Sequence, residues 1–508
     1  MQDSDAPNST PSDATPESAT AAAPVSATPE GHQRLKIGME FDGYRLEEKL
    51  HVGGMAALWR VTDLRQRPQK THNAEKPSTT LLPLIMKVPL LFTSDDPTAI
   101  VAFEVEQMIM PKLKGQHVPQ YIASGDFEAQ PYIVMEQIAG TSLRTRFDAA
   151  PLPIDEVVQI GIKVAQALQD LHRQHVIHLD LKPSNIMFRP NGDAVLIDFG
   201  LSRHDKLPDL LAEEFRLPLG TGPYISPEQV LGVRNEPHSD QFALGVLLYH
   251  LATGERPFGN PSGVAGLRKR LYRDPIPPRK HNAAIPPWLQ EVILRCLEVA
   301  PAARFESAAQ LAFALQDPSQ INLTARASKT TQDGTMAVLK RRFQAAGAEP
   351  FSQQSVAEQL SRAPIIVAAL DLSNSSATLT EQLRQEVRRL LFTEPGARLA
   401  CITVRKTSRF GLDESLLRGG QNIHVKQLVE LKHWARPLQL KGEKISFHVL
   451  EATDAANAVI DFAHKNGVDH IVIGSRGSSS IRRYLGSVSA QVVALAECTV
   501  TVVKASTT

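Results

Sequence analysis

Two short segments of the chain bring together side chains that could carry out a reaction. Residues 178–185 read His-Leu-Asp-Leu-Lys-Pro-Ser-Asn, and residues 196–200 read Leu-Ile-Asp-Phe-Gly. The carboxylates of Asp180 and Asp198 can accept a proton or bind a divalent cation. The amide of Asn185 can be a further metal ligand, and Lys182 can balance negative charge. Transfer of a phosphoryl group needs this combination, although each residue alone would more often be an ordinary turn, cap or solvated side chain.

Both segments resemble the catalytic loop and the metal-binding segment of protein kinases. A lysine two residues after the first aspartate is typical of the serine/threonine class. The resemblance implies that Asp180 receives the proton of the substrate hydroxyl and that Lys182 stabilises charge on the migrating group. It also implies that Asn185 and Asp198 bind the metal. ATP and Mg²⁺ are then the expected cofactors, with Mn²⁺ as an alternative metal.

Further landmarks of that family follow in its order between about Tyr44 and Leu315. Lys87 matches the strand lysine that holds the nucleotide phosphates, which makes it a catalytic candidate. We choose Glu106 as its helix partner, with Glu104 as the second choice. Met135 is expected at the back of the adenine pocket, with 136–138 beside the purine edge. The full set of expected nucleotide-binding residues is Gly53, Gly54, Val61, Lys87, Glu106, Met135, Glu136, Ile138, Asn185 and Asp198.

Three charged residues of this region are expected to be structural. Glu228 stands where the family has the last residue of Ala-Pro-Glu, Asp240 belongs to the following buried helix, and Arg304 is the expected ion partner of Glu228. Buried pairing and capping explain them without catalysis. Three histidines occur at helical-turn spacing and offer an alternative metal site: His172, His175 and His178. This alternative is disfavoured because His178 already has a place in the catalytic loop.

Two features depart from the family pattern. The phosphate-covering loop, residues 50–59, keeps Gly53 but has His51 and Ala56 at the usual first and third glycines. Because glycine lets backbone N–H groups approach phosphates closely, looser nucleotide binding is expected. Leu179 replaces the arginine that clasps a phosphate on the activation segment in kinases that phosphorylation switches on.

The activation segment itself lacks an acceptor for phosphate, since residues 203–220 contain no Ser, Thr or Tyr. The resemblance implies that the hydroxyl of Thr221 bonds Asp180 or Lys182. We therefore predict that the segment needs no phosphorylation and that control acts through ligand binding or association at the second domain. Acidic residues of the segment are expected to pair with bases that the sequence does not identify: Asp209, Glu213 and Glu214.

A second glycine pattern lies near the C-terminus. Ile-Val-Ile-Gly-Ser-Arg-Gly at 471–477 and Gly-Ser-Val-Ser at 486–489 resemble the universal stress protein family, over about 364–504. There, a tight turn after a strand and the start of a helix hold the phosphates of ATP. The residues that the resemblance places at the nucleotide are Asp371, Gly474, Gly477, Gly486 and Ser487. The eight-residue spacer between the two motifs is one residue shorter than is usual, so an ATP site and a fold kept for dimerisation are both open.

The elements that must position the first set of residues form one domain. Strand-like runs at 44–46, 58–61 and 84–88 predict an antiparallel meander interrupted by a polar insert, and later apolar residues recur at helical spacing. Together with the resemblance, this predicts the bilobal α+β protein kinase fold at 41–316. A Pro/Ser/Thr/Ala-rich tail at 1–40 has too few apolar residues to fold, and 317–362 is the expected linker, with one helical candidate at 336–346.

Strands and helices alternate in the second domain, 363–508, which predicts an α/β doubly wound parallel sheet. Its last strand, 500–503, would leave an apolar edge exposed in a monomer, so a homodimer through this domain is expected. The expected strands are 365–370, 399–404, 445–450, 470–473 and 500–503. The expected helices are 380–391, 425–434, 452–464 and 488–496.

Composition excludes several classes of protein. The 508 residues are 42% hydrophobic and 21% charged, which suits a globular chain with sizeable cores. A net charge of +1 lacks the basic excess of non-specific nucleic-acid binding. The sequence has no tract that approaches the ~20 apolar residues of a membrane-spanning helix, and we expect no export signal. The three dispersed cysteines fit no disulfide framework. We therefore expect a cytoplasmic protein without a membrane span or a nucleic-acid partner.

These observations predict a bacterial-type serine/threonine protein kinase that acts on protein substrates, in stress signalling, with a C-terminal domain that regulates or dimerises it. The alternative is a pseudokinase, an adenylate-sensing scaffold built from two nucleotide-binding folds. The intact set of Lys87, Asp180, Asn185 and Asp198 favours the enzyme. A kinase of small molecules is disfavoured because residues 220–228 resemble a peptide-substrate platform. Autophosphorylation is expected before residue 33 or in the linker after 317, where Ser and Thr are frequent.

Overall fold

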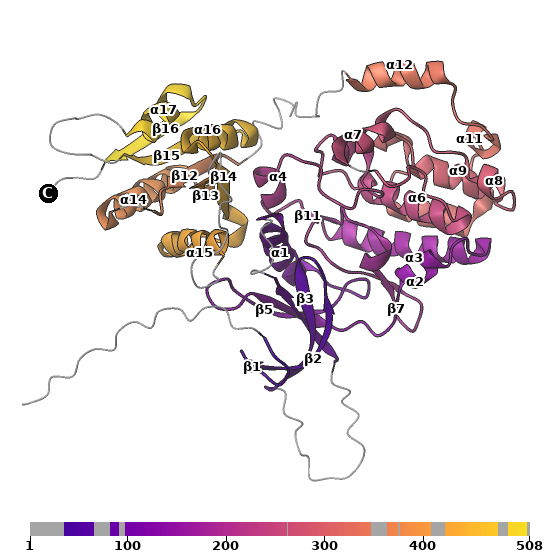
Figure 1. The fold of residues 1–508 in the computed structure, drawn as a ribbon, viewed down its shortest axis with the longest axis horizontal. Helices are drawn as coiled ribbons and strands as arrows, with labels where there is room; N and C mark the ends of the chain where they lie inside the picture. Colours follow the sequence, from indigo (N-terminus) through magenta and orange to yellow (C-terminus); the bar gives the residue numbers. More distant parts are fainter. Residues whose placement is uncertain are drawn as a thin grey trace, which may run out of the picture.

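A computed structural model of the chain shows two folded units side by side (Figure 1). It describes residues 35–65, 82–90, 97–261, 263–346, 363–373, 376–407, 422–475 and 486–504. Most of the N-terminal tail, the polar insert at 66–80, residues 347–362 of the expected linker and Gly477 therefore lie outside the described residues. No helix within the described part of the chain is long and apolar enough to cross a membrane.

The first unit begins with a six-stranded antiparallel sheet in the order β1-β2-β3-β4-β6-β5, which confirms the expected meander. Its central strands bury alternate apolar residues such as Trp59 and Met86 in one core, and Lys87 of β4 lies between Leu58 of β3 and Ile133 of β6. One helix, α1, covers the sheet and carries both candidate glutamates. The elements are β1 (Glu40–Phe41), β2 (Tyr44–Val52), β3 (Ala56–Asp63), β4 (Leu84–Pro89), α1 (Pro97–Ile109), β5 (Tyr121–Gly125) and β6 (Tyr132–Glu136).

The second lobe of this unit is mostly helical, as expected. Helix α6 is buried almost all round and α3 packs against it with one apolar face, so these two helices form the centre of the lobe. The helices are α2 (Leu143–Asp148), α3 (Ile154–Arg173), α4 (Leu210–Glu214), α5 (Pro227–Val230), α6 (His238–Thr253), α7 (Gly263–Arg268), α8 (Pro278–His281), α9 (Pro287–Cys296) and α10 (Ala308–Gln316). The short strands are β7 (Thr141–Ser142), β8 (Val176–Ile177), β9 (Ile186–Phe188), β10 (Ala194–Leu196) and β11 (Arg203–His204).

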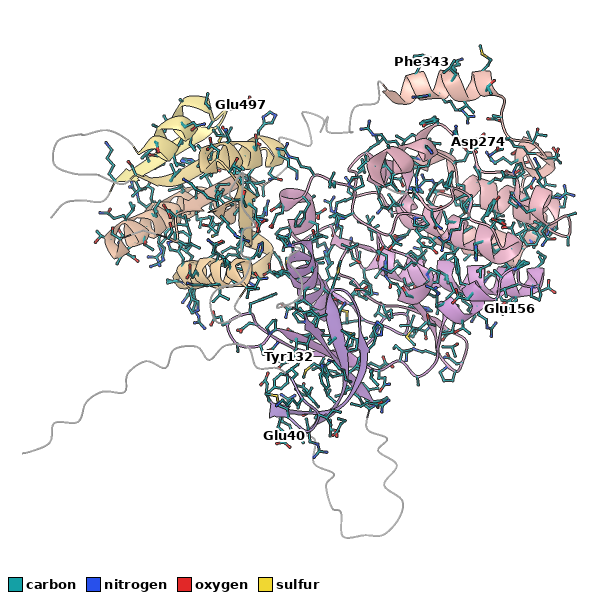
Figure 2. All side chains as sticks on the ribbon, in the orientation of Figure 1. Glu40, Tyr132, Glu156, Asp274, Phe343 and Glu497 are labelled. Atoms are coloured by element: carbon teal, nitrogen blue, oxygen red, sulfur yellow. The ribbon has the colours of Figure 1, made fainter. Side chains whose placement is uncertain are left out.

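The chain after α10 stays against this lobe for a further thirty residues or so. Helix α11 (Ala325–Ser328) packs on α9, and α12 (Thr335–Ala346) contains the helical candidate that the sequence predicted. Asp274 anchors the segment through ion pairs with Lys329 at 3.0 Å and with Arg341 at 2.6 Å. Figure 2 labels Asp274 in the lobe and Phe343 on α12. The side chain of Phe343 is largely exposed.

The second unit is a five-stranded parallel sheet in the order β14-β13-β12-β15-β16, which confirms the doubly wound fold. Alternate residues of β12 divide between two cores: Ile366 and Ala368 pack toward α14 and α15, and Val367 and Ala369 pack toward α16 and α17. The elements are β12 (Ile365–Leu370), α14 (Ala377–Thr393), β13 (Arg398–Lys406), α15 (Ile423–Ala435), β14 (Ile445–Ala452), α16 (Ala455–Asn466), β15 (His470–Ser475), α17 (Ser487–Leu495) and β16 (Thr499–Lys504).

Candidate active site

Lys87 connects three elements that are far apart in the sequence. Its Nζ lies 2.5 Å from Oε2 of Glu106 on α1 and 2.8 Å from Oδ1 of Asp198. Burial alone would lower the pKa of Lys87, but the two carboxylates outweigh burial and raise it. The lysine in turn holds the pKa of Asp198 at about 2. The structure therefore selects Glu106 as the partner of Lys87, as predicted, and Glu104 points elsewhere.

The loop after β8 places a carboxylate, a cation and an amide around one point. Oδ2 of Asp180 lies 2.6 Å from Nζ of Lys182, and Nδ2 of Asn185 donates to the backbone oxygen of Asp180 at 3.0 Å. Thr221 donates its hydroxyl to Oδ1 of Asp180 at 2.7 Å and its backbone N–H at 2.9 Å. The contact predicted for Thr221 is thus confirmed, and its hydroxyl is engaged within the site.

The backbone at this site adopts a conformation that non-glycine residues rarely take. Leu179 has φ of 62° and Asp198 has φ of 68°, both in the left-handed region. Asp240 at the start of α6 holds the loop, because its carboxylate accepts from the backbone N–H of His178 and of Leu179, each at 2.9 Å. It also lies 2.8 Å from the ring of His172. The loop geometry is therefore fixed from the core of the helical lobe.

The three histidines considered as metal ligands have other partners. His172 contacts Asp240, His178 lies 3.1 Å from the backbone oxygen of Ile197, and His175 lies 2.8 Å from Asp205. Among the residues that the structure describes, no group of three or more His, Cys, Asp or Glu side chains could hold a metal ion. The histidine alternative therefore finds no support in this part of the chain.

Asn185 and Asp198 offer oxygen atoms that suit a divalent cation. The backbone N–H of Ile197 donates to the backbone oxygen of Asn185 at 3.0 Å, which joins the two segments. Asn185 turns its amide nitrogen toward Asp180, and its Oδ1 accepts from the hydroxyl of Ser184 at 3.2 Å. The side chain of Asp198 remains 42% exposed although Lys87 binds Oδ1. One carboxylate and one amide oxygen are donors that Mg²⁺ accepts.

The nucleotide-facing residues of the first lobe are split between a tight turn and the buried sheet. The N–H of Gly53 donates to the oxygen of Ala56 at 2.9 Å, and Gly54 has open space around its Cα. Val61, Met135 and Ile138 are buried, as is Glu136. The sequence did not reveal that the side chain of Glu136 forms an ion pair with Arg189, 53 residues later. Only the backbone of Glu136 is therefore available to a nucleotide.

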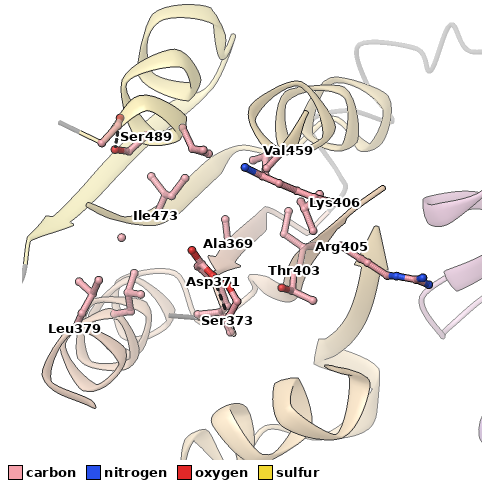
Figure 3. Close-up of a pocket in the computed structure, with 18 of the residues that line it drawn as sticks. Ala369, Asp371, Ser373, Leu379, Thr403, Arg405, Lys406, Val459, Ile473 and Ser489 are labelled. Atoms are coloured by element: carbon pink, nitrogen blue, oxygen red, sulfur yellow. Dashed lines mark hydrogen bonds between the residues drawn. The ribbon is translucent and has the colours of Figure 1, made fainter. Parts of the chain in front are cut away.

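A second candidate site lies at the carboxyl ends of the strands in the parallel sheet. A cavity of about 510 Å³ opens there (Figure 3), and four of the five predicted residues line it: Asp371, Gly474, Gly486 and Ser487. The fifth, Gly477, is outside the described residues. Asp371 is fixed by Ser373, whose hydroxyl donates to its carboxylate at 2.6 Å. Sequence reasoning missed Arg405 and Lys406 at the end of β13, which also line the cavity. Figure 3 shows Arg405 extending away from its centre.

Comparison with known proteins agrees with the division of the chain into two folded units. The protein kinase domain family matches residues 93–314, and the universal stress protein family matches residues 364–504. The chain thus carries a domain of the protein kinase family followed by a domain of the universal stress protein family.

Two of the curated relatives carry the name of a serine/threonine-protein kinase, one of them as a probable kinase. The serine/threonine-protein kinase PknB of Mycolicibacterium smegmatis is 30% identical over 275 residues, which are 53% of this chain and 42% of that protein. A probable serine/threonine-protein kinase of Clostridium perfringens is 30% identical over 232 residues, 46% of this chain and 34% of that one. The match thus spans less than half the length of either relative. A solved kinase domain of Mycobacterium tuberculosis PknI is 23% identical with a TM-score of 0.40, covering 56% of this chain and 98% of that one.

Proposed function

We propose that the first unit is a serine/threonine protein kinase that transfers the γ-phosphoryl group of ATP to Ser or Thr hydroxyls of protein substrates, in the context of stress signalling. The observation that carries this proposal is the connected set formed by Lys87, Glu106 and Asp198 on one side and Asp180, Lys182 and Thr221 on the other. The names of the curated relatives support the substrate class. Domain boundaries at 41–316 and 363–508 belong to the same proposal.

The residues act in the following roles. Asp180 accepts the proton of the substrate hydroxyl while the oxygen of that hydroxyl forms a bond to the γ-phosphorus. The bond between the γ-phosphorus and the bridging oxygen of the β-phosphate breaks, which gives ADP and a phosphoester. Lys87 holds the nucleotide phosphates, and Lys182 lies beside Asp180 where charge develops on the migrating group. Asn185 and Asp198 would hold Mg²⁺, or Mn²⁺ in its place, which neutralises phosphate charge. The rest of the reaction is positioning by fixed side chains.

An assay of phosphoryl transfer tests this proposal. Full-length protein incubated with γ-labelled ATP and Mg²⁺ is expected to label Ser or Thr residues of itself or of a general substrate such as casein. Asp180→Asn keeps the size of the side chain but removes the proton acceptor, so the rate is expected to fall about 10²- to 10⁴-fold. Equal rates in the two proteins, or labelling in neither, would support the pseudokinase alternative.

We propose further that the cavity in the second unit binds ATP or another adenine nucleotide. Three features support this: the position of the cavity at the carboxyl edge of a parallel sheet, the start of α17 at Gly486 and Ser487, and the cation of Lys406 at its rim. The edge position of β16 likewise supports a homodimer through this domain.

Binding stoichiometry distinguishes the two nucleotide sites. Calorimetric titration of the full chain with a non-hydrolysable ATP analogue is expected to show two sites. Ser487→Asp places a carboxylate at the start of α17, where phosphates should lie, so one site should be lost while nucleotide binding at the kinase site is kept. Ala494→Asp, at an exposed position of α17 outside the cavity lining, is the control and should keep both sites. One site in the unmodified chain would contradict the proposal for the second domain.

A further inference from the structure

Helix α4 lies in the activation segment, between Asp198 and the platform at 220–228, and it is held by three other elements. It packs against α1 of the kinase domain and against β14 and α16 of the C-terminal domain (Figure 1). Leu210 and Leu211 are fully buried in an apolar cluster that includes residues of both domains. Because a helix of five residues has almost no stability by itself, these tertiary contacts determine whether the segment is ordered.

Glu213 of α4 is clasped by two cations of the C-terminal domain. Its Oε1 lies 2.6 Å from Nη2 of Arg398 on β13, and its Oε2 lies 2.9 Å from Nε2 of His448 on β14. Burial would raise the pKa of Glu213, but His448 and Arg398 lower it to about 2. Burial would lower the pKa of His448, but Glu213 and Glu214 raise it to about 9. Each partner therefore favours the ionised form of the other, and separating a buried pair of this kind is costly.

The end of the same helix is held through its backbone. Nζ of Lys465 on α16 donates to the oxygen of Phe215 at 2.8 Å, and Nδ2 of Asn466 donates to the oxygen of Glu213 at 3.4 Å. The last carbonyl groups of a helix have no partner within it. The C-terminal domain thus supplies partners to both the side chain and the backbone of α4.

A separate contact reaches α1, the helix that carries the partner of Lys87. Lys432 of α15 forms an ion pair with Glu104, and its ammonium also lies 4.9 Å from the ring centre of Phe127. Glu104 and Glu106 are two positions apart on a helix, so they project to nearly opposite sides. Glu106 faces Lys87 and Glu104 faces the C-terminal domain. The helix is therefore fixed from both sides.

The hydroxyls that flank the activation segment are already engaged. Ser202 donates to the backbone oxygen of His178 at 3.0 Å and is buried, and Thr221 donates to Asp180. Leu179 is buried and supplies no charge beside the catalytic loop. The charged contacts that a phosphate on the activation segment would otherwise form are replaced here by contacts from cations of the C-terminal domain.

We propose that Arg398, His448 and Lys432 of the C-terminal domain are positioning residues for phosphoryl transfer. By binding Glu213 on α4 and Glu104 on α1, they keep the activation segment and Glu106 in the arrangement of the active site. Docking of the C-terminal domain thereby takes the place of a phosphate on the activation segment. This inference rests on the proposed kinase function for its kinetic consequence, but its structural consequence can be measured without turnover.

The test compares Arg398→Met and Lys432→Met with a matched control at the same interface. The control is Arg216→Ala, because Arg216 pairs with Asp461 at 3.4 Å across the domains while both side chains are about two-thirds exposed. Two further variants are added: Arg398→Lys keeps a cation at this position, and Glu213→Gln changes only the kinase domain. All are made in the full-length chain and checked by circular dichroism.

Hydrogen exchange is the readout that does not depend on catalysis. In Arg398→Met and Glu213→Gln, the amides of residues 210–215 are expected to exchange at least about tenfold faster. In Lys432→Met, the amides of α1 are expected to exchange faster by a similar factor. The amides of α6 should be unchanged in all three variants. The control and Arg398→Lys should keep the protection of the unmodified chain. Unchanged protection in the Met variants overturns the inference, even if the chain proves to be inactive as a kinase.

Kinetics test the positioning role. Because peptide binds only the ordered segment, kcat/KM for a Ser/Thr peptide should fall about tenfold in Arg398→Met, mainly through a higher KM, while Arg216→Ala is unchanged. Phosphatase treatment of the unmodified protein should leave its initial rate unchanged. Faster exchange in α4 without any kinetic change, or a phosphatase-sensitive rate restored by ATP and mapped to Thr221 or Ser202, overturns the proposal.

A pH profile gives a further check. Because the pKa of His448 is raised to about 9, its contribution to docking is complete below the ordinary histidine pKa and is lost as pH rises through 9. Protection of α4 should therefore decline between about pH 7 and 9 in the unmodified chain, and His448→Gln should remove this dependence. The charged groups around His448 are Glu213 and Glu214 of α4, Arg398 of β13 and Lys465 of α16, with Glu104 of α1 and Glu451 of β14 beyond them. A profile that is the same in both proteins contradicts this role of His448.

Discussion

Replacing Lys87 with methionine is expected to reduce the rate of phosphoryl transfer about 100- to 1000-fold, which is the usual cost of removing one preorganised charge from an active site. Methionine fills a similar volume but cannot bind phosphate oxygens. It also removes the cation that lies between the carboxylates of Glu106 and Asp198, at 2.5 and 2.8 Å. Without this ammonium group, the buried carboxylate of Glu106 loses its cation, and α1 loses its link to the metal-binding segment.

The measurement is a comparison of kcat and of the KM for ATP in the full-length chain. Lys49→Met is the matched control, because Lys49 is an exposed lysine of the same sheet that lies over the ring of Trp59, 5.2 Å from its centre. The control should keep the rate of the unmodified protein. A rate in Lys87→Met within twofold of that protein would mean that the set around Lys87 does not act on phosphate, and it would favour the scaffold alternative.

Replacing Arg304 with methionine is expected to cost about 3–5 kcal/mol of stability, because it leaves a buried carboxylate unpaired. Arg304 and Glu228 form a two-pronged ion pair at 2.7 and 2.8 Å, as the sequence predicted, and both side chains are buried. Ser239 also donates to Glu228 at 2.7 Å, so the carboxylate is tied to α6 as well. The catalytic groups do not contact this pair, so the change acts through folding of the helical lobe.

Urea unfolding measures this effect when Trp288 of α9 is kept as the reporter of the helical lobe and the tryptophans at 59 and 434 are replaced by phenylalanine. The double variant Glu228→Gln with Arg304→Met should recover part of the loss, since it removes the unpaired charge. Arg144→Met, which breaks an exposed pair with Asp148, is the control and should leave the midpoint unchanged. A midpoint in Arg304→Met equal to that of the control would contradict the structural role of this pair.

The sequence alone determined the groups of the candidate active site that are close together along the chain. Asp180, Lys182 and Asn185 fall within six residues, and the hairpin of β9 and β10 that follows brings Asp198 back beside them. The periodicity of apolar residues was likewise enough to predict helices and strands in both units, because a helix or a strand repeats its buried face every few residues. The bilobal kinase fold itself was predicted from the resemblance to the protein kinase family. The eventual pairs of Lys87 with Glu106 and of Arg304 with Glu228 came from the order of family landmarks.

Only the tertiary structure decided which distant charges meet. Nothing in the spacing of the chain relates Glu213 to Arg398, 185 residues later, or Glu104 to Lys432, 328 residues later. The sequence could predict that acidic residues of the activation segment need bases, but the choice among the 55 Lys and Arg residues depends on how the two domains pack. Charge pairs have no period along the chain, and a pair between domains exists only once both folds have formed and their surfaces are in contact. For that reason the residues that could perform catalysis were visible in the sequence, and those that hold them in position were not.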